Sequence, residues 1–433
     1  MPAIARALLM LVLAALVAAP VARAQAPPTG AGPCPQGEAR ASCFLWTGKV
    51  TFIGDGDTLS VDLDGDGTKK PVRVRMTGIN APEETVYTNR PEDRVGECHA
   101  NDATARLEEL VNSANGRVQL AAIDPASMSH SRLRRAVSIR IHSGWRDLGR
   151  VMVNEGYALF LPSRHEWAWN KSYGKLAQES AARYDGIWNS VACAFGPPAS
   201  IRFWVNPDPE GNDGNDANGE WFKVKNLDPA NALDISGWRA RDSDNRGYAF
   251  PPGTVIAPGA TITLYVGIGT NTGTDFFWGL SHPILDNVRA DRYLGDGAYL
   301  FDLDGDMRSA VQYPCRYRCY DFALGAVALH AAYKRSKEFV TLSNRGERAL
   351  DLEGYRLASA PPAASSYVLG PDSVLAPGEQ LTLHVKGDPA GDTHLDRYWG
   401  KTRTILGNAG DKVELKSPRW VEIACTAWGN QSC

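Results

Sequence analysis

Residues 49–83 of this 433-residue chain read KVTFIGDGDTLSVDLDGDGTKKPVRVRMTGINAPE. Residues 49–53 are strand-like, apolar and polar side chains alternate through 59–63 and 72–76, and clusters of Asp and Gly separate these runs. Alternation with a period of two is typical of β-strands, and Asp-Gly clusters are typical of the turns between them. This stretch therefore predicts short strands joined by tight turns.

The turn at Asp64–Gly67 has an alternative interpretation. Asp62–Gly67 resembles the start of an EF-hand calcium loop, which needs a bidentate glutamate at its end. Arg73 stands at that position, and its side chain offers no oxygen to a cation. We therefore favour a hairpin turn.

The pattern beyond residue 83 combines more strands with short helices. Residues 117–122 and 136–141 are strand-like, and 101–113, 147–155 and 173–184 have helical features. The strand–helix–strand alternation of parallel sheets is not evident. The sequence therefore predicts a mainly β multidomain protein that begins with a five-stranded barrel of OB type with three helices.

Three residues around this stretch have the chemistry of phosphodiester hydrolysis. Asp57 lies in a glycine turn, and Arg75 and Glu83 follow within one short segment. A carboxylate can hold a hard cation, and a guanidinium fork suits two phosphate oxygens. A second carboxylate can deprotonate water. We therefore predict a phosphodiesterase site here.

From Gly48 to Asn189 the chain resembles the staphylococcal nuclease (thermonuclease) family. The order and spacing of short motifs carry this resemblance: DGDT at 55–58, Arg75, GINAPE at 78–83, RRAV at 134–137, DLG at 147–149, GYA at 156–158 and GIW at 186–188. The resemblance implies hydrolysis of DNA and RNA with calcium. It also implies cleavage on the 5′-oxygen side of the phosphate, which leaves 3′-phosphate ends.

The resemblance also implies catalytic roles. Arg75 and Arg135 would grip the scissile phosphate, and Glu83 would orient or deprotonate the attacking water. Arg135 is preferred because it lies nine residues before Gly144, as in the family. Arg134 is the alternative.

The calcium site implied by the resemblance has Asp57 as its principal ligand. Asn80 and the backbone carbonyl of Ala81 would supply the remaining protein ligands. Asp55 would contact these ligands without binding calcium directly, or it would bind calcium through a water molecule. Family members often have aspartate where this chain has Asn80. Because an amide oxygen carries no charge, we expect a weaker calcium site, and we expect Asn80→Asp to tighten calcium binding.

The C-terminal half contains an internal repeat with a period of about 120 residues. The matching pieces are EWFKV at 220–224 with EFVTL at 338–342, ALDISGW at 232–238 with ALDLEGY at 349–355, APG at 257–259 with APG at 376–378, WG at 278–279 with WG at 399–400, and ILDN at 284–287 with ILGN at 405–408. This period suits one β-sandwich. The repeats resemble lamin-tail domains. This resemblance implies Ig-like β-sandwiches with a binding or display role and no catalytic residues.

These patterns predict five segments. Residues 1–24 are predicted to be a secretory signal peptide, because Arg6 precedes an apolar run and Ala22-Arg23-Ala24 suits cleavage before Gln25. The run is too short to favour a membrane anchor. The remaining predicted segments are a flexible leader at 25–45, the nuclease-like domain at 46–195, and sandwiches at 199–318 and 325–427, with Gly196-Pro197-Pro198 as a boundary.

The eight cysteines suggest an oxidising compartment, because an even number in an exported chain usually forms disulfides. A zinc site is disfavoured by the absence of a Cys-x-x-Cys pair. Sequence proximity suggests Cys34–Cys43, Cys98–Cys193, Cys315–Cys319 and Cys425–Cys433.

The sequence therefore predicts a secreted or periplasmic, calcium-dependent nuclease acting on DNA and RNA. Its formal net charge of −3 does not indicate a nucleic-acid partner, so a local cluster must provide the contact. One alternative is a barrel that binds nucleic acid without cleaving it. Another is a surface-adhesion protein, whose sandwiches attach to a surface or polysaccharide.

Overall fold

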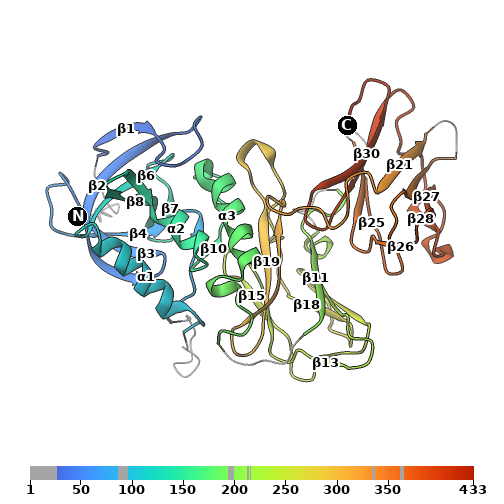
Figure 1. The fold of residues 1–433 in the computed structure, drawn as a ribbon, viewed down its shortest axis with the longest axis horizontal. Helices are drawn as coiled ribbons and strands as arrows, with labels where there is room; N and C mark the ends of the chain where they lie inside the picture. The colour runs from blue at the N-terminus through green and yellow to red at the C-terminus, as the bar shows by residue number, and fades with distance from the viewer. Residues whose placement is uncertain are drawn as a thin grey trace, which may run out of the picture.

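The computed structural model describes residues 27–85, 96–193, 199–211, 214, 216–333, 337–360 and 365–433. The predicted signal peptide at 1–24 and the boundary at Gly196–Pro198 lie outside these residues. An N-terminal unit and two β-sandwiches follow one another along the longest axis of the molecule (Figure 1). The described chain is mainly β-structure with few helices. No helix in the described ranges is long and apolar enough to cross a membrane.

The strands of the N-terminal unit pair in a ring. β2 pairs with β3, β3 with β4, β4 with β8, β8 with β6, and β6 returns to β2. The pairing of β4 with β8 is parallel, and the other pairings are antiparallel. The bounds are β2 (Ser42–Asp55), β3 (Thr58–Leu63), β4 (Val72–Met76), β6 (Arg117–Ala122) and β8 (Arg132–Ile141), with β7 (Met128–Ser129) and β9 (Gly144–Asp147) along β8.

The leader is ordered where it was predicted to be flexible. β1 (Gly30–Pro33) pairs antiparallel with β2, with Gly30 opposite Leu45. A disulfide between Cys34 and Cys43 closes the turn that joins these strands. The composition suggested flexibility, but pairing with a long strand and a covalent link order this segment.

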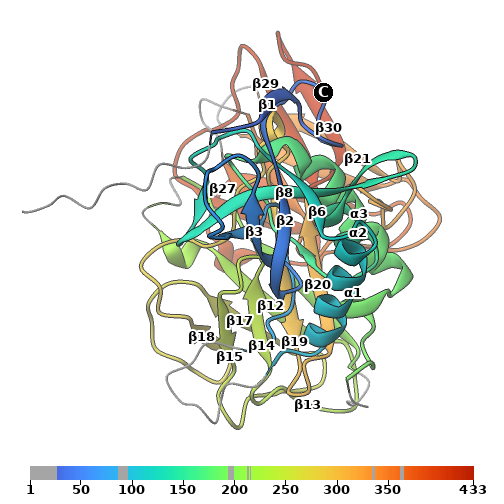
Figure 2. The same cartoon turned by 90° about the vertical axis from the view of Figure 1, so that its left-hand side faces the viewer.

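Helices cover one side of the ring of strands (Figure 2). They are α1 (Ala100–Asn112), α2 (Leu148–Asn154) and α3 (Asn170–Arg183). α1 buries Ala103, Leu107 and Leu110 against the strands, at the spacing of one helical face. The buried Asp147 caps α2 by accepting a hydrogen bond from Arg150 N at 3.1 Å, and it also accepts from the Tyr173 hydroxyl at 2.8 Å. This pair therefore ties α3 to the start of α2.

The two sandwiches have the same topology. In the first, one sheet has the order β11-β12-β17-β18 and the other β15-β14-β19-β20; in the second, the orders are β21-β22-β27-β28 and β25-β24-β29-β30. β17–β18 and β27–β28 are the parallel pairs at equivalent places. A short antiparallel pair, β13–β16 or β23–β26, accompanies each sandwich.

The strand bounds of the first sandwich are β11 (Ile201–Asn206), β12 (Trp221–Asn226), β13 (Leu233–Asp234), β14 (Arg239–Asp242), β15 (Gly247–Ala249), β16 (Val255–Ile256), β17 (Thr261–Tyr265), β18 (Asp275–Phe277), β19 (Asp296–Phe301) and β20 (Met307–Tyr313). Those of the second are β21 (Val327–Ala332), β22 (Phe339–Asn344), β23 (Leu350–Asp351), β24 (Arg356–Ser359), β25 (Ser366–Val368), β26 (Val374–Leu375), β27 (Gln380–Lys386), β28 (Asp396–Lys401), β29 (Asp411–Lys416) and β30 (Glu422–Trp428).

Buried glutamates occupy equivalent positions in the two repeats. Glu220 accepts hydrogen bonds from the backbone of Ile284 at 2.7 Å and Leu285 at 3.2 Å. Its counterpart Glu338 accepts from the matching Ile-Leu pair at 2.8 and 3.2 Å. The repeated sequence motifs therefore have the same structural role, in which a carboxylate at the start of one strand satisfies the backbone of a distant loop.

The predicted cysteine pairs are confirmed: Cys34–Cys43, Cys98–Cys193, Cys315–Cys319 and Cys425–Cys433 are disulfides. Pairing by sequence proximity succeeded even for Cys98 and Cys193, which are 95 residues apart.

The N-terminal unit and the first sandwich share a small apolar core. It consists of Leu159, Ile187 and Trp188 from the first and Tyr299 and Met307 from the second. The Trp188 and Tyr299 rings lie 6.1 Å apart between centroids. Helix α3 lies beside β19 at this junction (Figure 1). Because apolar burial holds the two units together, their facing surfaces form defined pockets.

Candidate functional site

The turn between β2 and β3 places Asp57 inside the N-terminal unit. Its carboxylate is fully buried and accepts hydrogen bonds from Ala81 N at 2.8 Å and the Thr58 hydroxyl at 3.0 Å. At Gly56, a Cβ atom would lie 2.8 Å from the Cβ atoms of Ala81 and Ala103. Only glycine therefore allows the turn to approach this closely and to bury Asp57.

Arg75 on β4 is the partner of Asp57. The guanidinium forms an ion pair with the Asp57 carboxylate, and its Nη2 donates to Asn80 Oδ1 at 2.6 Å. Burial, and after it the positive charge of Arg132, lowers the pKa of Arg75 to about 10. The group stays protonated at neutral pH, so it offers a desolvated positive charge.

Asn80 connects this site to the first sandwich. It lies in β5 (Ile79–Asn80), which pairs with β10 (Leu159–Phe160). Its amide Nδ2 donates to the backbone carbonyl of Ser243 at 2.9 Å, while its Oδ1 accepts from Arg75. These two contacts orient the amide, because the nitrogen must face a carbonyl and the oxygen a guanidinium.

The other predicted carboxylates lie at the edge of this group. Asp55 Oδ1 accepts from Asp57 N at 3.0 Å, and Glu97 Oε2 accepts from Glu83 N at 3.0 Å. Burial raises the pKa of the Asp55 carboxyl, against the effect of Arg75. Burial also raises the pKa of Glu83, and the charge of Asp55 adds to that shift. A carboxylate with a raised pKa is a better general base than an exposed one.

A pocket of about 190 Å³ joins several of these residues. Its lining includes the predicted Arg75, Asn80 and Glu83. Asp57, Asp55 and Ala81 lie beside it through the contacts described above. The lining also includes polar residues that the sequence did not predict, or that it ranked second: Ser129, His130, Arg132, Arg134, Asp244 and Asn245.

Arg135 does not reach this pocket. Its side chain is only 1% exposed, and the guanidinium donates to the carbonyls of Ser127 and Pro125 at 3.2 and 2.7 Å. It lies over the Trp46 ring, with 4.5 Å between Cζ and the ring centroid. The structure therefore does not bring the predicted Arg135 to the pocket with Arg75 and Glu83, because its side chain leaves β8 on the opposite face.

Arg134 lines the pocket that Arg135 does not reach. On the parallel strands β4 and β8, Arg75 and Arg134 are register partners, so both side chains lie on one face. Arg132, two residues before Arg134, lies on the same face of β8. Its Nη1 donates to the Thr58 hydroxyl at 2.9 Å. Alternation along β8 places Arg132 and Arg134 on one face and Arg135 on the other, and the register between β4 and β8 decides which face meets the pocket.

The donor chemistry suits a hard cation such as calcium. Asp57 and Asp55 offer carboxylates, and Asn80 and Ala81 offer carbonyl oxygens, which are the ligand types calcium prefers. The Arg75 guanidinium contacts both Asp57 and Asn80 Oδ1. A cation that used both oxygens would therefore compete with Arg75 for them.

A comparison with known families matches the C-terminal half of the chain. Residues 204–315 and 326–430 each match the family model of the lamin tail domain. The chain belongs to the lamin tail domain family. Both matching segments follow the N-terminal unit and coincide with the two sandwiches. No curated protein matches the chain.

The first lamin tail domain contributes directly to the pocket. Asp244 and Asn245 line it, and Ser243 accepts the hydrogen bond from Asn80. All three residues come from the turn between β14 and β15. They were not predicted from the sequence, because residues more than 150 positions from Arg75 become its neighbours only through docking of the domains.

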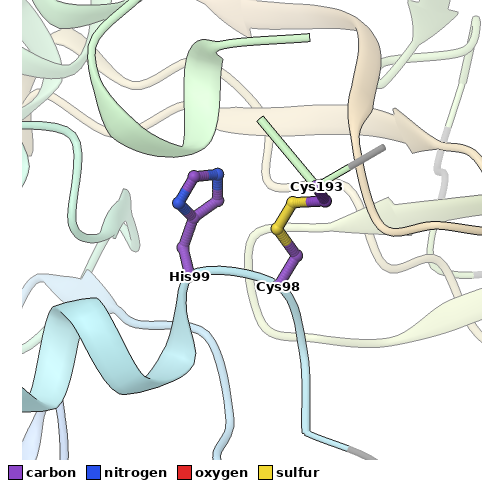
Figure 3. A group of neighbouring side chains, drawn as sticks. All are labelled: Cys98, His99 and Cys193. Atoms are coloured by element: carbon purple, nitrogen blue, oxygen red, sulfur yellow. A yellow bond between two sulfur atoms is a disulfide. The ribbon is translucent and has the colours of Figure 1, made fainter. Parts of the chain in front are cut away.

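A second group at this junction contains Cys98, His99 and Cys193, whose possible ligand atoms lie within 4.8 Å of one another (Figure 3). The two sulfur atoms are bonded as a disulfide. They therefore offer no thiolates, which are the form in which cysteine binds zinc. The disulfide instead links the segment after Glu97 to the end of the N-terminal unit.

Proposed function

We propose that the N-terminal unit is a phosphodiesterase that hydrolyses DNA and RNA with calcium. The observation that carries the proposal is the pairing of Arg75 with Arg134 on one face of β4 and β8, beside Glu83 in one pocket. Adjacent guanidinium forks suit the several oxygens of one phosphate group. The closed pairing of five strands is also what we expect of an OB-type barrel, in line with the resemblance to staphylococcal nuclease.

Each residue has a role in this proposal. Arg75 and Arg134 hold the phosphate and stabilise the charge that grows on it during attack. Glu83 accepts the proton of the attacking water, a role to which its raised pKa is suited. Asp57, Asp55, Asn80 and the Ala81 carbonyl would hold calcium, which when bound supplies positive charge to the phosphate.

We also propose that the protein is exported. The cysteines are joined in disulfides, and such bonds persist in oxidising compartments. The signal-peptide pattern at residues 1–24 supports the same conclusion.

Digestion of plasmid DNA and of RNA by the purified chain Gln25–Cys433 tests the proposal, with calcium or with a chelator. We expect cleavage with calcium and its loss in Arg75→Ala. Arg73→Ala is the matched control, because Arg73 lies on the same strand but is exposed and is not among the residues that line the pocket. Equal cleavage by Arg75→Ala and the unmodified chain would refute the assignment.

Nucleic-acid binding without cleavage is the second candidate. It is favoured by one observation: Arg75 is already engaged by Asp57 and Asn80, which leaves less of the guanidinium for a phosphate. Binding of labelled DNA by the unmodified chain, without cleavage in calcium, would support this candidate.

For the lamin tail domains we propose a role in attachment to a surface or polysaccharide. Cell fractionation of full-length and truncated chains tests this role.

A further inference from the structure

The turn between β14 and β15 forms one wall of the candidate pocket. Asp244 and Asn245 at its tip line the pocket together with Arg75, Arg132 and Arg134. The pocket therefore has a positive wall from the N-terminal unit and a negative group on the wall from the lamin tail domain.

Hydrogen bonds hold this turn in its shape. The Asp242 carboxylate accepts from Arg246 N at 2.8 Å, and Ser243 Oγ accepts from Gly297 N at 3.0 Å. Asn245 has a left-handed backbone with φ of 65°, and its carbonyl accepts from Arg239 Nη2 at 3.2 Å. A turn held by these contacts within itself and with β14 and β19 presents Asp244 in a defined position.

The turn is also joined to the predicted catalytic segment. Asn80 donates to Ser243 O at 2.9 Å on one side. On the other side, Arg239 forms an ion pair with Glu97 at 3.3 Å, and Glu97 accepts from Glu83 N at 3.0 Å. These contacts reach both Asn80 and Glu83, so the lamin tail domain is positioned by residues of the site itself.

We propose that the first lamin tail domain is a working part of the phosphodiesterase site, in which Asp244 lowers affinity for phosphates beyond the one held by the arginines. This inference rests on the proposed function. A nucleic-acid strand carries a phosphate at every nucleotide, and a carboxylate beside the pocket repels the neighbouring ones. The chemical class selected is a single phosphodiester, in preference to closely spaced phosphates such as those of pyrophosphate.

Asp244→Asn tests the proposal because it removes the charge and keeps the size of the side chain. In the full chain with chelator present, we expect single-stranded DNA to bind about fivefold more tightly at low salt. The gain should shrink at high salt, since Asp244 is half exposed and its charge is screened. Asp244→Lys should tighten binding further. In Asp244→Asn, the affinity for pyrophosphate should rise more than the affinity for inorganic phosphate, as measured by competition with the labelled DNA.

Asp291→Asn is the matched control. Asp291 lies on the same domain, and its side chain is 56% exposed, against 51% for Asp244. The Asp291 carboxylate pairs with an arginine at 3.3 Å, and the Asp244 carboxylate pairs with another at 3.2 Å. Asp291 is not among the residues that line the pocket. We expect its variant to bind DNA as the unmodified chain does.

The outcomes separate this inference from the proposed function. If Arg134→Ala weakens DNA binding while Asp244→Asn and Asp244→Lys leave it unchanged, the phosphate site stands and the inference is overturned. If Asp244→Asn tightens binding but no cleavage occurs with calcium, the effect of Asp244 on phosphate binding stands, and both hydrolysis and the part of Asp244 in a hydrolytic site are refuted. If the unmodified chain does not bind DNA at all, both fail.

Discussion

Asn80 Nδ2 donates a hydrogen bond to the backbone carbonyl of Ser243 at 2.9 Å, and this contact joins the N-terminal unit to the first lamin tail domain. Both groups are buried. An aspartate has no donor to offer when it is ionised, so the contact accounts for an amide at this position. From the sequence, Asn80 was interpreted as a weakened calcium ligand, whereas the tertiary contact gives the amide a structural role of its own.

Asn80→Asp therefore has two opposing effects. Without calcium, we expect the free energy of unfolding to fall by about 1–3 kcal/mol, because the Ser243 carbonyl loses its donor and faces a carboxylate. Denaturant titration with chelator measures this loss. The added charge should still tighten calcium binding, which calorimetry measures. A variant as stable as the unmodified chain would show that the contact with Ser243 contributes nothing.

Arg134→Ala should lower activity, whereas Arg135→Ala should lower stability. We expect Arg134→Ala to lower kcat/KM about 10²- to 10³-fold, the usual cost of removing one group that stabilises transition-state charge. Its thermal stability should change little, because the side chain faces the pocket. Digestion kinetics and a melting curve on the same preparation provide both measurements.

Arg135→Ala should act through stability instead. The substitution removes charged hydrogen bonds to Ser127 and Pro125 and the contact with Trp46. We expect a loss of about 3 kcal/mol in the free energy of unfolding. Below the melting transition, the folded fraction should retain most of its kcat/KM. Loss of activity without loss of stability would return Arg135 to the catalytic set.

The pH dependence of cleavage should reveal the ionisation of the Glu83 carboxyl. Burial, and then the charge of Asp55, raises the pKa of this carboxyl above its ordinary value. A general base works only when ionised, so kcat/KM should rise with pH through the raised pKa and fall toward acid. Glu83→Gln should abolish most activity, remove this acid limb from the residual rate and leave the fold intact. An unchanged limb in Glu83→Gln would assign it to another group.

Removal of a disulfide should cost more stability where the link closes a longer loop, with a cost that grows as the logarithm of loop length. Cys98 and Cys193 are 95 residues apart, and Cys315 and Cys319 are four apart. By chain entropy, replacing the first pair by serine should cost about 4–5 kcal/mol and the second about 2 kcal/mol. Denaturant titrations of the two double variants give the comparison. Equal losses would mean that the long link does not restrict the unfolded chain as expected.

Much of the fold was predictable because its signals are local. The alternation at 59–63 and 72–76 corresponds to β3 and β4, and the Asp64 turn is a hairpin whose carboxylate pairs with Arg117. The repeat was predictable because each copy buries the same groups, as with Glu220 and Glu338. The leader was predicted incorrectly because its strand exists only through pairing with β2.

The sequence by itself determined the strand order around Asp57, the cysteine pairs and the duplication of the lamin tail domain, since spacing and periodicity encode these features directly. Only the tertiary structure decided which of two adjacent arginines faces the pocket, because that depends on the register between β4 and β8. It alone brought Ser243 and Asp244 to Asn80 and Arg75. Contacts between domains arise from the packing of whole surfaces, and no local pattern in either segment specifies them.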